Sequence, residues 1–178
     1  MRFLTGLVLA AFGSMALAAD AKYALNGENT KVEFTGTKKD GKHTGGFKTL
    51  SGNVSVPGGD VTKAAIEVTI ETASIYSDNP GLTAHLKNKD FFDVETNKTS
   101  TFKSTKVEKD GDGYKVTGDL TLNGKTKSIS FPARVSEAGG SFTLTSEFKI
   151  DRTDFGMSYG AGKVDNEVAL KVDVKAKQ

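Results

Sequence analysis

The stretch "GYKVTGDLTLNGKTKSISFPARV", residues 113–135, contains two runs of alternating apolar and polar residues on either side of Asn123-Gly124. Alternation with a period of two places the apolar side chains on one face of a β-strand. Asn-Gly between two such runs is the strongest short-range signal for a β-hairpin. The stretch therefore predicts two adjacent antiparallel strands that share one apolar face.

The same alternation recurs through most of the chain. Clear runs lie at 66–70, 142–150 and 163–175, and weaker ones lie at 30–36, 46–57 and 100–108. Glycine-rich turns join neighbouring runs closely at 57–60, 110–113 and 138–140, which predicts that consecutive strands are antiparallel. Together with the hairpin this gives eight strands in a meander, interrupted once at 74–96.

Eight strands that are apolar on one face must bury that face, either between two sheets or inside a barrel. Alternation alone does not separate these folds, but regular hairpins and the removal of exposed strand edges favour the barrel. We therefore predict an all-β fold, an eight-stranded antiparallel barrel. A barrel of this size is either just filled by its side chains or holds one small ligand.

The interruption predicts one short helix at about 80–89, because the two-residue period is lost after Asn79-Pro80-Gly81. Phe91 and Phe92 follow the helix, in an irregular segment where adjacent rings can point to different places. We expect one ring to anchor the helix and the other to face a cavity. The alternative is that both belong to the core. The long connection 74–99 is the predicted gate, since lids are usually loops on a rigid scaffold.

Residues 1–19 have a basic start, an apolar run and the small-x-small pattern Ala16-Leu17-Ala18, which predicts a cleaved secretory signal peptide. The remainder, 20–178, has the length of a single domain and no further run long enough to span a membrane. The chain has no cysteine, so an exported form has no disulfide, which fits a bacterial periplasm. Its 24 basic and 22 acidic residues alternate and predict no nucleic-acid partner.

The apolar parity of the strands, with the two rings after the helix, predicts the ligand-binding side chains of an apolar cavity. They are Phe34, Val68, Ile70, Phe91, Phe92, Phe102, Leu120, Leu122, Phe131, Phe142, Leu144 and Phe155. Three residues are candidates for a polar headgroup site or for the rim: His85, Arg152 and Asp154. For Arg152 we favour an ion pair that fixes a loop, with headgroup binding as the alternative.

The sequence contains no convincing motif for catalysis or for metal binding. Gly156-Met157-Ser158-Tyr159-Gly160 matches the nucleophile-elbow pattern, but no histidine follows it and a strand comes next instead of a helix. His43 and His85 stand alone, whereas a zinc site needs three or four ligands. We expect no enzyme activity, no metal and no required cofactor.

Three segments resemble the YceI-like family of polyisoprenoid-binding periplasmic proteins: HLKNKDFFDV at 85–94 followed by TFKS at 101–104, GDLTLNGKTK at 118–127, and IDRTDFGM at 150–157. With Val32-Glu33-Phe34, the resemblance covers nearly all of 20–178. It implies a lipocalin-like eight-stranded barrel with an inserted helix, whose tunnel binds long isoprenoids, quinones or other amphiphilic lipids. Asn29-Thr30 and the proline-free 97–100 depart from the family pattern and leave the ligand open.

We therefore expect a periplasmic protein that holds a long apolar or amphiphilic lipid, for carriage or sequestration. A bound isoprenoid lipid or quinone is the expected ligand, and stable insertion into a membrane is not expected. The alternative is a secreted barrel with a filled core that acts in protein interaction or stress protection. The sequence does not determine the oligomeric state, and a homodimer stays open.

Overall fold

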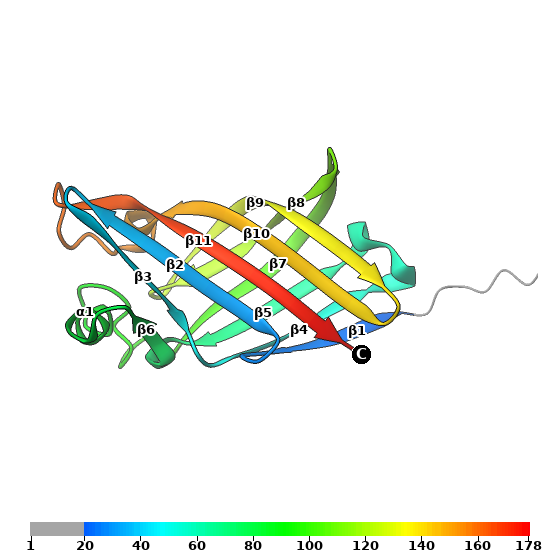
Figure 1. Ribbon diagram of the computed structural model, residues 1–178, viewed down its shortest axis with the longest axis horizontal. Helices are drawn as coiled ribbons and strands as arrows, with labels where there is room; N and C mark the ends of the chain where they lie inside the picture. Colours follow the sequence, from blue (N-terminus) through cyan, green and yellow to red (C-terminus); the bar gives the residue numbers. More distant parts are fainter. Residues whose placement is uncertain (1–19) are drawn as a thin grey trace, which may run out of the picture.

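The computed structural model describes residues 20–178 as one antiparallel sheet that curls into a barrel-like shape (Figure 1). Its eleven strands are β1 (Ala21–Asn26), β2 (Thr30–Lys38), β3 (Gly41–Phe47), β4 (Leu50–Val56), β5 (Ala65–Glu71), β6 (Ile75–Ser77), β7 (Thr99–Asp110), β8 (Gly113–Leu122), β9 (Lys125–Ala138), β10 (Ser141–Asp151) and β11 (Val164–Lys177). The predicted signal peptide, 1–19, lies outside the described residues.

The strands from β7 to β11 pair in chain order, as the predicted meander requires, and so do β2 with β3 and β4 with β5. The meander is broken where β1 pairs with β4, β3 with β6 and β11 with β2. The sheet order is β1-β4-β5-β7-β8-β9-β10-β11-β2-β3-β6, so β1 and β6 are the two edges of the hydrogen-bonded ladder. In Figure 1 the strands β2, β11 and β10 cross in front of β4, β5 and β7. Buried hydrophobic side chains from both layers belong to one cluster, so the apolar face of the sheet lies between them.

One α-helix interrupts the strands, α1 (Pro80–Leu86), and four short 3-10 turns accompany it: η1 (Pro57–Gly59), η2 (Val61–Lys63), η3 (Thr72–Ser74) and η4 (Arg152–Phe155). The helix is at the predicted place but ends at Leu86 instead of residue 89. No helix in the described part of the chain is long and apolar enough to cross a membrane.

The predicted all-β antiparallel barrel-like fold is confirmed, but the count of eight strands is wrong, because β1, β3 and β6 were not expected. In β3, Gly45 and Gly46 interrupt the alternation of apolar and polar residues that would identify the strand. A Cβ at Gly45 would collide with the carbonyl oxygen of Tyr76 and the ring of Phe34. Glycine is needed for this close approach, and it weakens the sequence pattern of a strand. The other missed edge strand, β6, has only three residues.

The opening hairpin forms as predicted between β8 and β9. Asn123 and Gly124 have φ angles of 48° and 70°, which are the left-handed values that a type I′ turn requires. On the strands beside the turn, the hydroxyl groups of Thr121 and Thr126 lie 2.7 Å apart. The hairpin thereby fixes which residues of both strands face inward.

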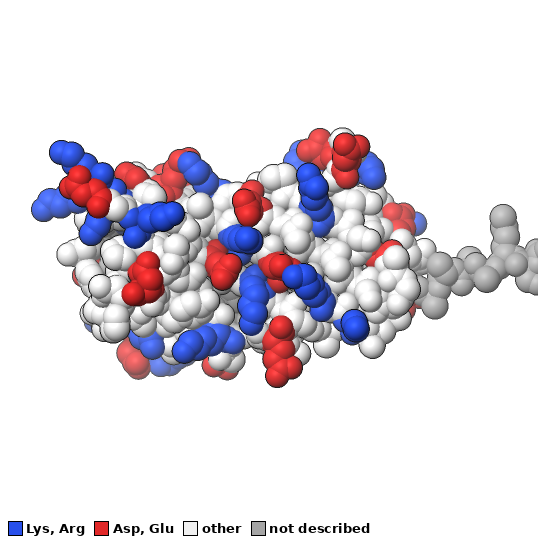
Figure 2. All heavy atoms as spheres, viewed as in Figure 1, with Lys and Arg blue, Asp and Glu red and all other residues white. Residues whose placement is uncertain are grey.

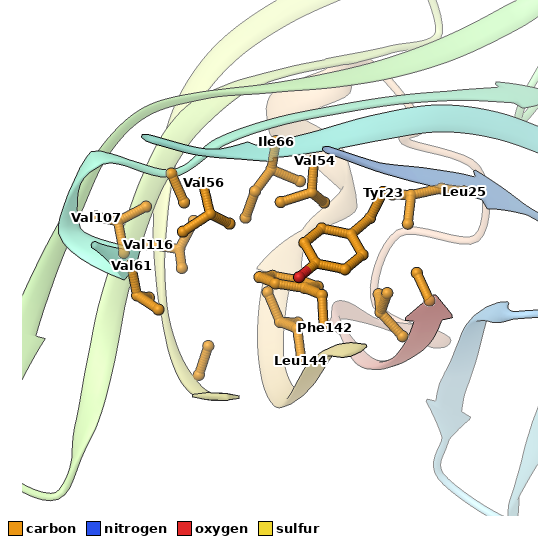
Figure 3. Packing of buried hydrophobic residues seen from close by; sticks show 14 of the residues in the cluster. Tyr23, Leu25, Val54, Val56, Val61, Ile66, Val107, Val116, Phe142 and Leu144 are labelled. Atoms are coloured by element: carbon orange, nitrogen blue, oxygen red, sulfur yellow. The ribbon is translucent and has the colours of Figure 1, made fainter. Parts of the chain in front are cut away.

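Side chains fill the end of the barrel that lies away from α1. Tyr23 of β1 packs against Phe142 of β10, with ring centroids 5.5 Å apart, and aliphatic residues surround both rings (Figure 3). The members labelled there are Tyr23, Leu25, Val54, Val56, Val61, Ile66, Val107, Val116, Phe142 and Leu144, and we call this cluster the filled core. On the face shown in Figure 2, basic and acidic side chains are interspersed over the outer surface.

Candidate functional site

A cavity of about 300 Å³ lies at the α1 end of the barrel. Strands β2, β8 and β11 form most of its walls, β3, β5, β7 and β10 each contribute one or two residues, and α1 with the segment after it forms its cover. The main wall and cover residues are Val32, Phe34, Leu120, Leu122, Val168, Leu170, Leu82, Leu86, Phe91 and Phe92. Such a volume lies at the lower end of the range for ligand sites, roughly 300–1,000 Å³, and the apolar lining is typical of them.

The cover owes its shape to the way α1 begins and ends. The side chain of Asn79 caps the helix by accepting a hydrogen bond from the Leu82 amide at 3.0 Å. After the last helical residue the chain turns back, so that the amide of Phe92 donates to the carbonyl of Leu86 at 3.1 Å. Asp93 completes the turn in the left-handed region, with a φ angle of 43°.

This turn sends the two adjacent phenylalanine rings to different partners. Phe91 packs edge-on against the ring of His85, with centroids 5.1 Å apart, and Phe92 packs edge-on against Phe47 at 5.6 Å. Both rings are buried, and both line the cavity. The expected division, with one ring anchoring the helix and the other facing the cavity, is therefore not seen. Each ring packs against another aromatic ring and also lines the cavity.

The mouth of the cavity carries polar groups from three segments. His85 lies 2.9 Å from a carboxylate oxygen of Asp90, and the exposed ring of Tyr159 packs on the imidazole at 4.6 Å. Across the mouth, His43 lies 2.9 Å from a carboxylate oxygen of Asp78. A hydrogen bond from a backbone amide of β3, followed by the one with His43, holds the pKa of the Asp78 carboxyl below its usual value.

Arg152 is buried and holds the loop before β11 in place. Its guanidinium donates to the backbone carbonyls of Asp165 at 3.0 Å, Val164 at 3.2 Å and Met157. No carboxylate of residues 20–178 forms an ion pair with it. The expected ion pair is therefore wrong, but Arg152 does fix a loop, and it lines the cavity.

The structure brings eight of the predicted site residues together around the cavity: Phe34, Ile70, Phe91, Phe92, Leu120, Leu122, His85 and Arg152. The others do not line it. Phe131, Phe142 and Leu144 belong to the filled core, and Val68 and Phe102 pack against that core. Phe155 is buried behind the cavity wall, and Asp154 is exposed on η4. Ligand contact by any of these residues stays a prediction.

Several lining residues were not expected: Val32, Phe47, Leu82, Leu86, Ser100, Ile150, Met157, Tyr159, Val168 and Leu170. For some the signal was present. Val168 and Leu170 have the apolar parity of their strand, and Leu82 and Leu86 lie on one face of the helix. For Phe47 and Met157 no pattern in the sequence indicates the position, because both lie where a strand or turn ends.

The described residues offer no arrangement for metal binding, since no three His, Cys, Asp or Glu side chains of 20–178 gather at one place. Ser158 lies exposed in the loop before β11, and a strand follows it. The strand–turn–helix context of a nucleophile elbow is therefore not present at this serine. What the cavity offers chemically is an apolar space with a polar mouth.

Comparison with protein families matches residues 23–176 to the YceI-like domain, which confirms the resemblance seen in the sequence motifs. A UPF0312 protein of Serratia proteamaculans is 35% identical over 177 residues, which cover 96% of this chain and 92% of that protein. Protein YceI of Escherichia coli is 31% identical over 170 residues, which cover 92% and 89% of the two chains.

Two solved structures share the fold. BcnA of Burkholderia cenocepacia superposes with a TM-score of 0.77 at 27% identity, over 83% of this chain and 96% of that one. A polyisoprenoid binding domain from Saccharophagus degradans superposes with a TM-score of 0.67 at 14% identity, over 88% and 98% of the two chains. At so low an identity, the second match concerns the fold alone.

Proposed function

The chain belongs to the YceI-like family, and from this membership we propose that it binds a long apolar or amphiphilic lipid in the cavity beneath α1. The candidate lipids are a polyisoprenoid, an isoprenoid quinone or a fatty-acid-like chain, held for carriage or sequestration. The polyisoprenoid binding domain with the same fold supports this choice of ligand class.

The observation that carries the proposal is apolar surface left uncovered inside the barrel. Phe34, Ile70 and Leu120 point toward the interior, yet each is only partly buried because it faces the cavity. A hydrocarbon chain that covers this surface gains about 0.8 kcal/mol for each methylene group removed from water. The outer surface carries the charged residues, so the interior is the favourable place for a lipid tail (Figure 2).

The size of the cavity determines how a long lipid has to bind. About 300 Å³ holds only part of a polyisoprenoid. The remainder must either pass out through the mouth beside Tyr159 or displace the cover formed by α1 and the following loop. The segment 74–99 thus remains the proposed gate, and the rings of Phe91 and Phe92 are the contacts that its movement would break.

A second function class keeps one observation in its favour. One end of the barrel is filled by side chains, as expected for a protein whose task is protein interaction or stress protection (Figure 3). The cavity at the other end favours lipid binding over this alternative. We further propose that the protein is exported to the periplasm, that 20–178 forms a single domain, and that it is a binding protein without enzyme activity.

A cavity-filling substitution tests the proposal. In the variant Leu120→Trp the indole should occupy the cavity and reduce binding of a long-chain lipid at least tenfold. The matched control is Asp119→Trp, which places the same indole on the outer face of β8. Binding is measured by equilibrium dialysis against farnesol, with circular dichroism to show that both variants fold. Equal binding by both variants would contradict the proposed site.

A further inference from the structure

Ser100, the second residue of β7, carries a buried hydroxyl group that has no hydrogen-bond partner within residues 20–178. The residue is only 2% exposed. Buried hydroxyl groups in folded proteins nearly always have a partner, because an unpaired one has lost its bond to water without compensation. The unpaired state of this serine therefore needs a physical reason.

Ser100 differs in this respect from the other buried hydroxyl groups of residues 20–178. Three further Ser and Thr residues are buried, and each donates to a neighbouring oxygen: Thr30, Thr72 and Ser146. One other buried oxygen is unpaired, Oδ1 of Asp173, but the second oxygen of that carboxylate accepts from Lys175 at 2.9 Å. Among residues 20–178, Ser100 is the one buried Ser or Thr whose hydroxyl is wholly unsatisfied.

The side chain of Ser100 faces the cavity. In the sheet it lies directly opposite Ile70 of β5, and paired residues point to the same face. Ile70 and Ser100 both line the cavity. On the other side, Leu122 of β8 lies one position beyond the Thr101–Thr121 pair and lines the cavity as well. The hydroxyl is therefore a polar group between two apolar residues of the cavity wall, Ile70 and Leu122.

The nearest rival as a polar anchor, Arg152, is already engaged. Each of its three guanidinium nitrogens donates to a backbone carbonyl, one in the loop before β11 and two at the start of β11. The polar groups of the mouth are also paired, His43 with Asp78 and His85 with Asp90. Lys38 and Tyr159 also line the cavity, but both are exposed, so Ser100 is the buried hydroxyl of the lining whose hydrogen-bonding capacity residues 20–178 leave unused.

We propose that Ser100 is a specificity-determining residue of the lipid site, whose hydroxyl donates a hydrogen bond to an uncharged oxygen of the ligand, such as a carbonyl. This inference rests on the proposed function. It narrows the ligand class to neutral oxygen-bearing amphiphiles, because the Ser100 hydroxyl has no charge to offset an ionised headgroup. Arg152, the buried cation that lines the same cavity, directs each of its guanidinium nitrogens to a backbone carbonyl. The oxygen atom then lies inside the cavity and not in the solvent at the mouth.

Two probes of equal chain length test the inference, undecan-2-one and undecane, each dialysed to equilibrium against the delipidated protein and quantified by gas chromatography. Ser100→Ala should weaken binding of the ketone by about 2- to 10-fold, the range for one neutral hydrogen bond, and leave undecane within twofold. Ser100→Thr keeps the hydroxyl and should restore ketone binding. Ser146→Ala removes a buried hydroxyl that bonds to Pro132 outside the cavity and should change neither probe.

Melting without ligand supplies a second readout. Ser100→Ala should not lower the melting temperature, because it removes an unsatisfied group, whereas Ser146→Ala should lower it. If Ser100→Ala leaves ketone binding unchanged, the hydroxyl holds only a water molecule and the inference is wrong. Undecanoate that binds more tightly than the ketone, and weakens with salt, would overturn the neutral class. If neither neutral probe binds the unaltered protein, the proposed function fails as well.

Discussion

Replacing Phe142 by alanine should lower the free energy of unfolding without changing lipid retention. Phe142 is 0% exposed in the filled core, and its ring lies 5.5 Å from that of Tyr23. A buried Phe→Ala change costs about 3–5 kcal/mol. Loss of the aromatic pair, about 0.5–1.5 kcal/mol, places this case in the upper part of the range. At roughly 2–4 °C per kcal/mol, a cost of about 4–5 kcal/mol should lower the melting midpoint by about 8–20 °C.

The matched variant is Phe34→Ala, which removes a partly buried ring from the cavity wall. Its cost should be smaller, about 1–2 kcal/mol, while its lipid release should be faster. Urea unfolding gives the stabilities, and transfer of lipid to acceptor vesicles at 25 °C gives the release rates. The division into a filled core and a binding cavity would be refuted if Phe142→Ala, while still folded, released lipid as fast as Phe34→Ala.

Three further outcomes are expected. Phe91→Ala and Phe92→Ala should both melt earlier and both release lipid faster, since each ring is buried and lines the cavity; normal release from either folded variant would remove that ring from the gate. Burial and a hydrogen bond to Glu137 raise the pKa of Tyr23 to about 12, so stability should fall between about pH 10 and pH 12, and Tyr23→Phe should abolish that fall in alkaline melts. The pKa of Asp78 is lowered, so its carboxylate stabilises the fold above about pH 4, and this stabilisation is lost as the pH falls further. Asp78→Asn should lower the stability at pH 7 and reduce the loss of stability in acid. An unchanged dependence of stability on pH below about pH 4 would contradict this.

The sequence predicts which residues of each strand face the interior of the barrel, but not whether such a residue lies at the cavity end or at the filled end. Leu120 and Phe142 have the same apolar parity in their strands, and both point inward. Leu120 lines the cavity, whereas Phe142 lies in the filled core. A period of two determines only the side of the sheet. Which inward residues meet a cavity depends on where the long-range packing leaves space, and no local pattern records that.

The three strands that sequence reasoning missed have different causes. The strand β1 could have been recognised from the sequence, since its apolar residues Ala21, Tyr23 and Leu25 occupy every second position and are buried. The other two were not readable. In β3 the approach of the Tyr76 carbonyl selects glycine, and glycine carries no strand pattern. The edge strand β6 is too short for any period to show.

The polar residues of the site show a similar division. Asn79-Pro80 gave the start of α1 because capping is a local interaction. The carbonyl partners of Arg152 include Val164 and Asp165 at the start of β11, and their identity depends on how the loop before that strand closes. Ser100 is the inward residue two before Phe102, but its lack of a partner is a property of the assembled wall.

The lipid content of the protein itself tests the central claim most directly. The purified protein is extracted with organic solvent, and the extract is analysed by mass spectrometry, with Leu120→Trp treated in the same way. We predict one class of long-chain lipid, close to one molecule per chain, in the unaltered protein and a large reduction in the variant. An extract without lipid from protein that also fails to take up added farnesol, or equal lipid in both proteins, would contradict binding in the cavity beneath α1.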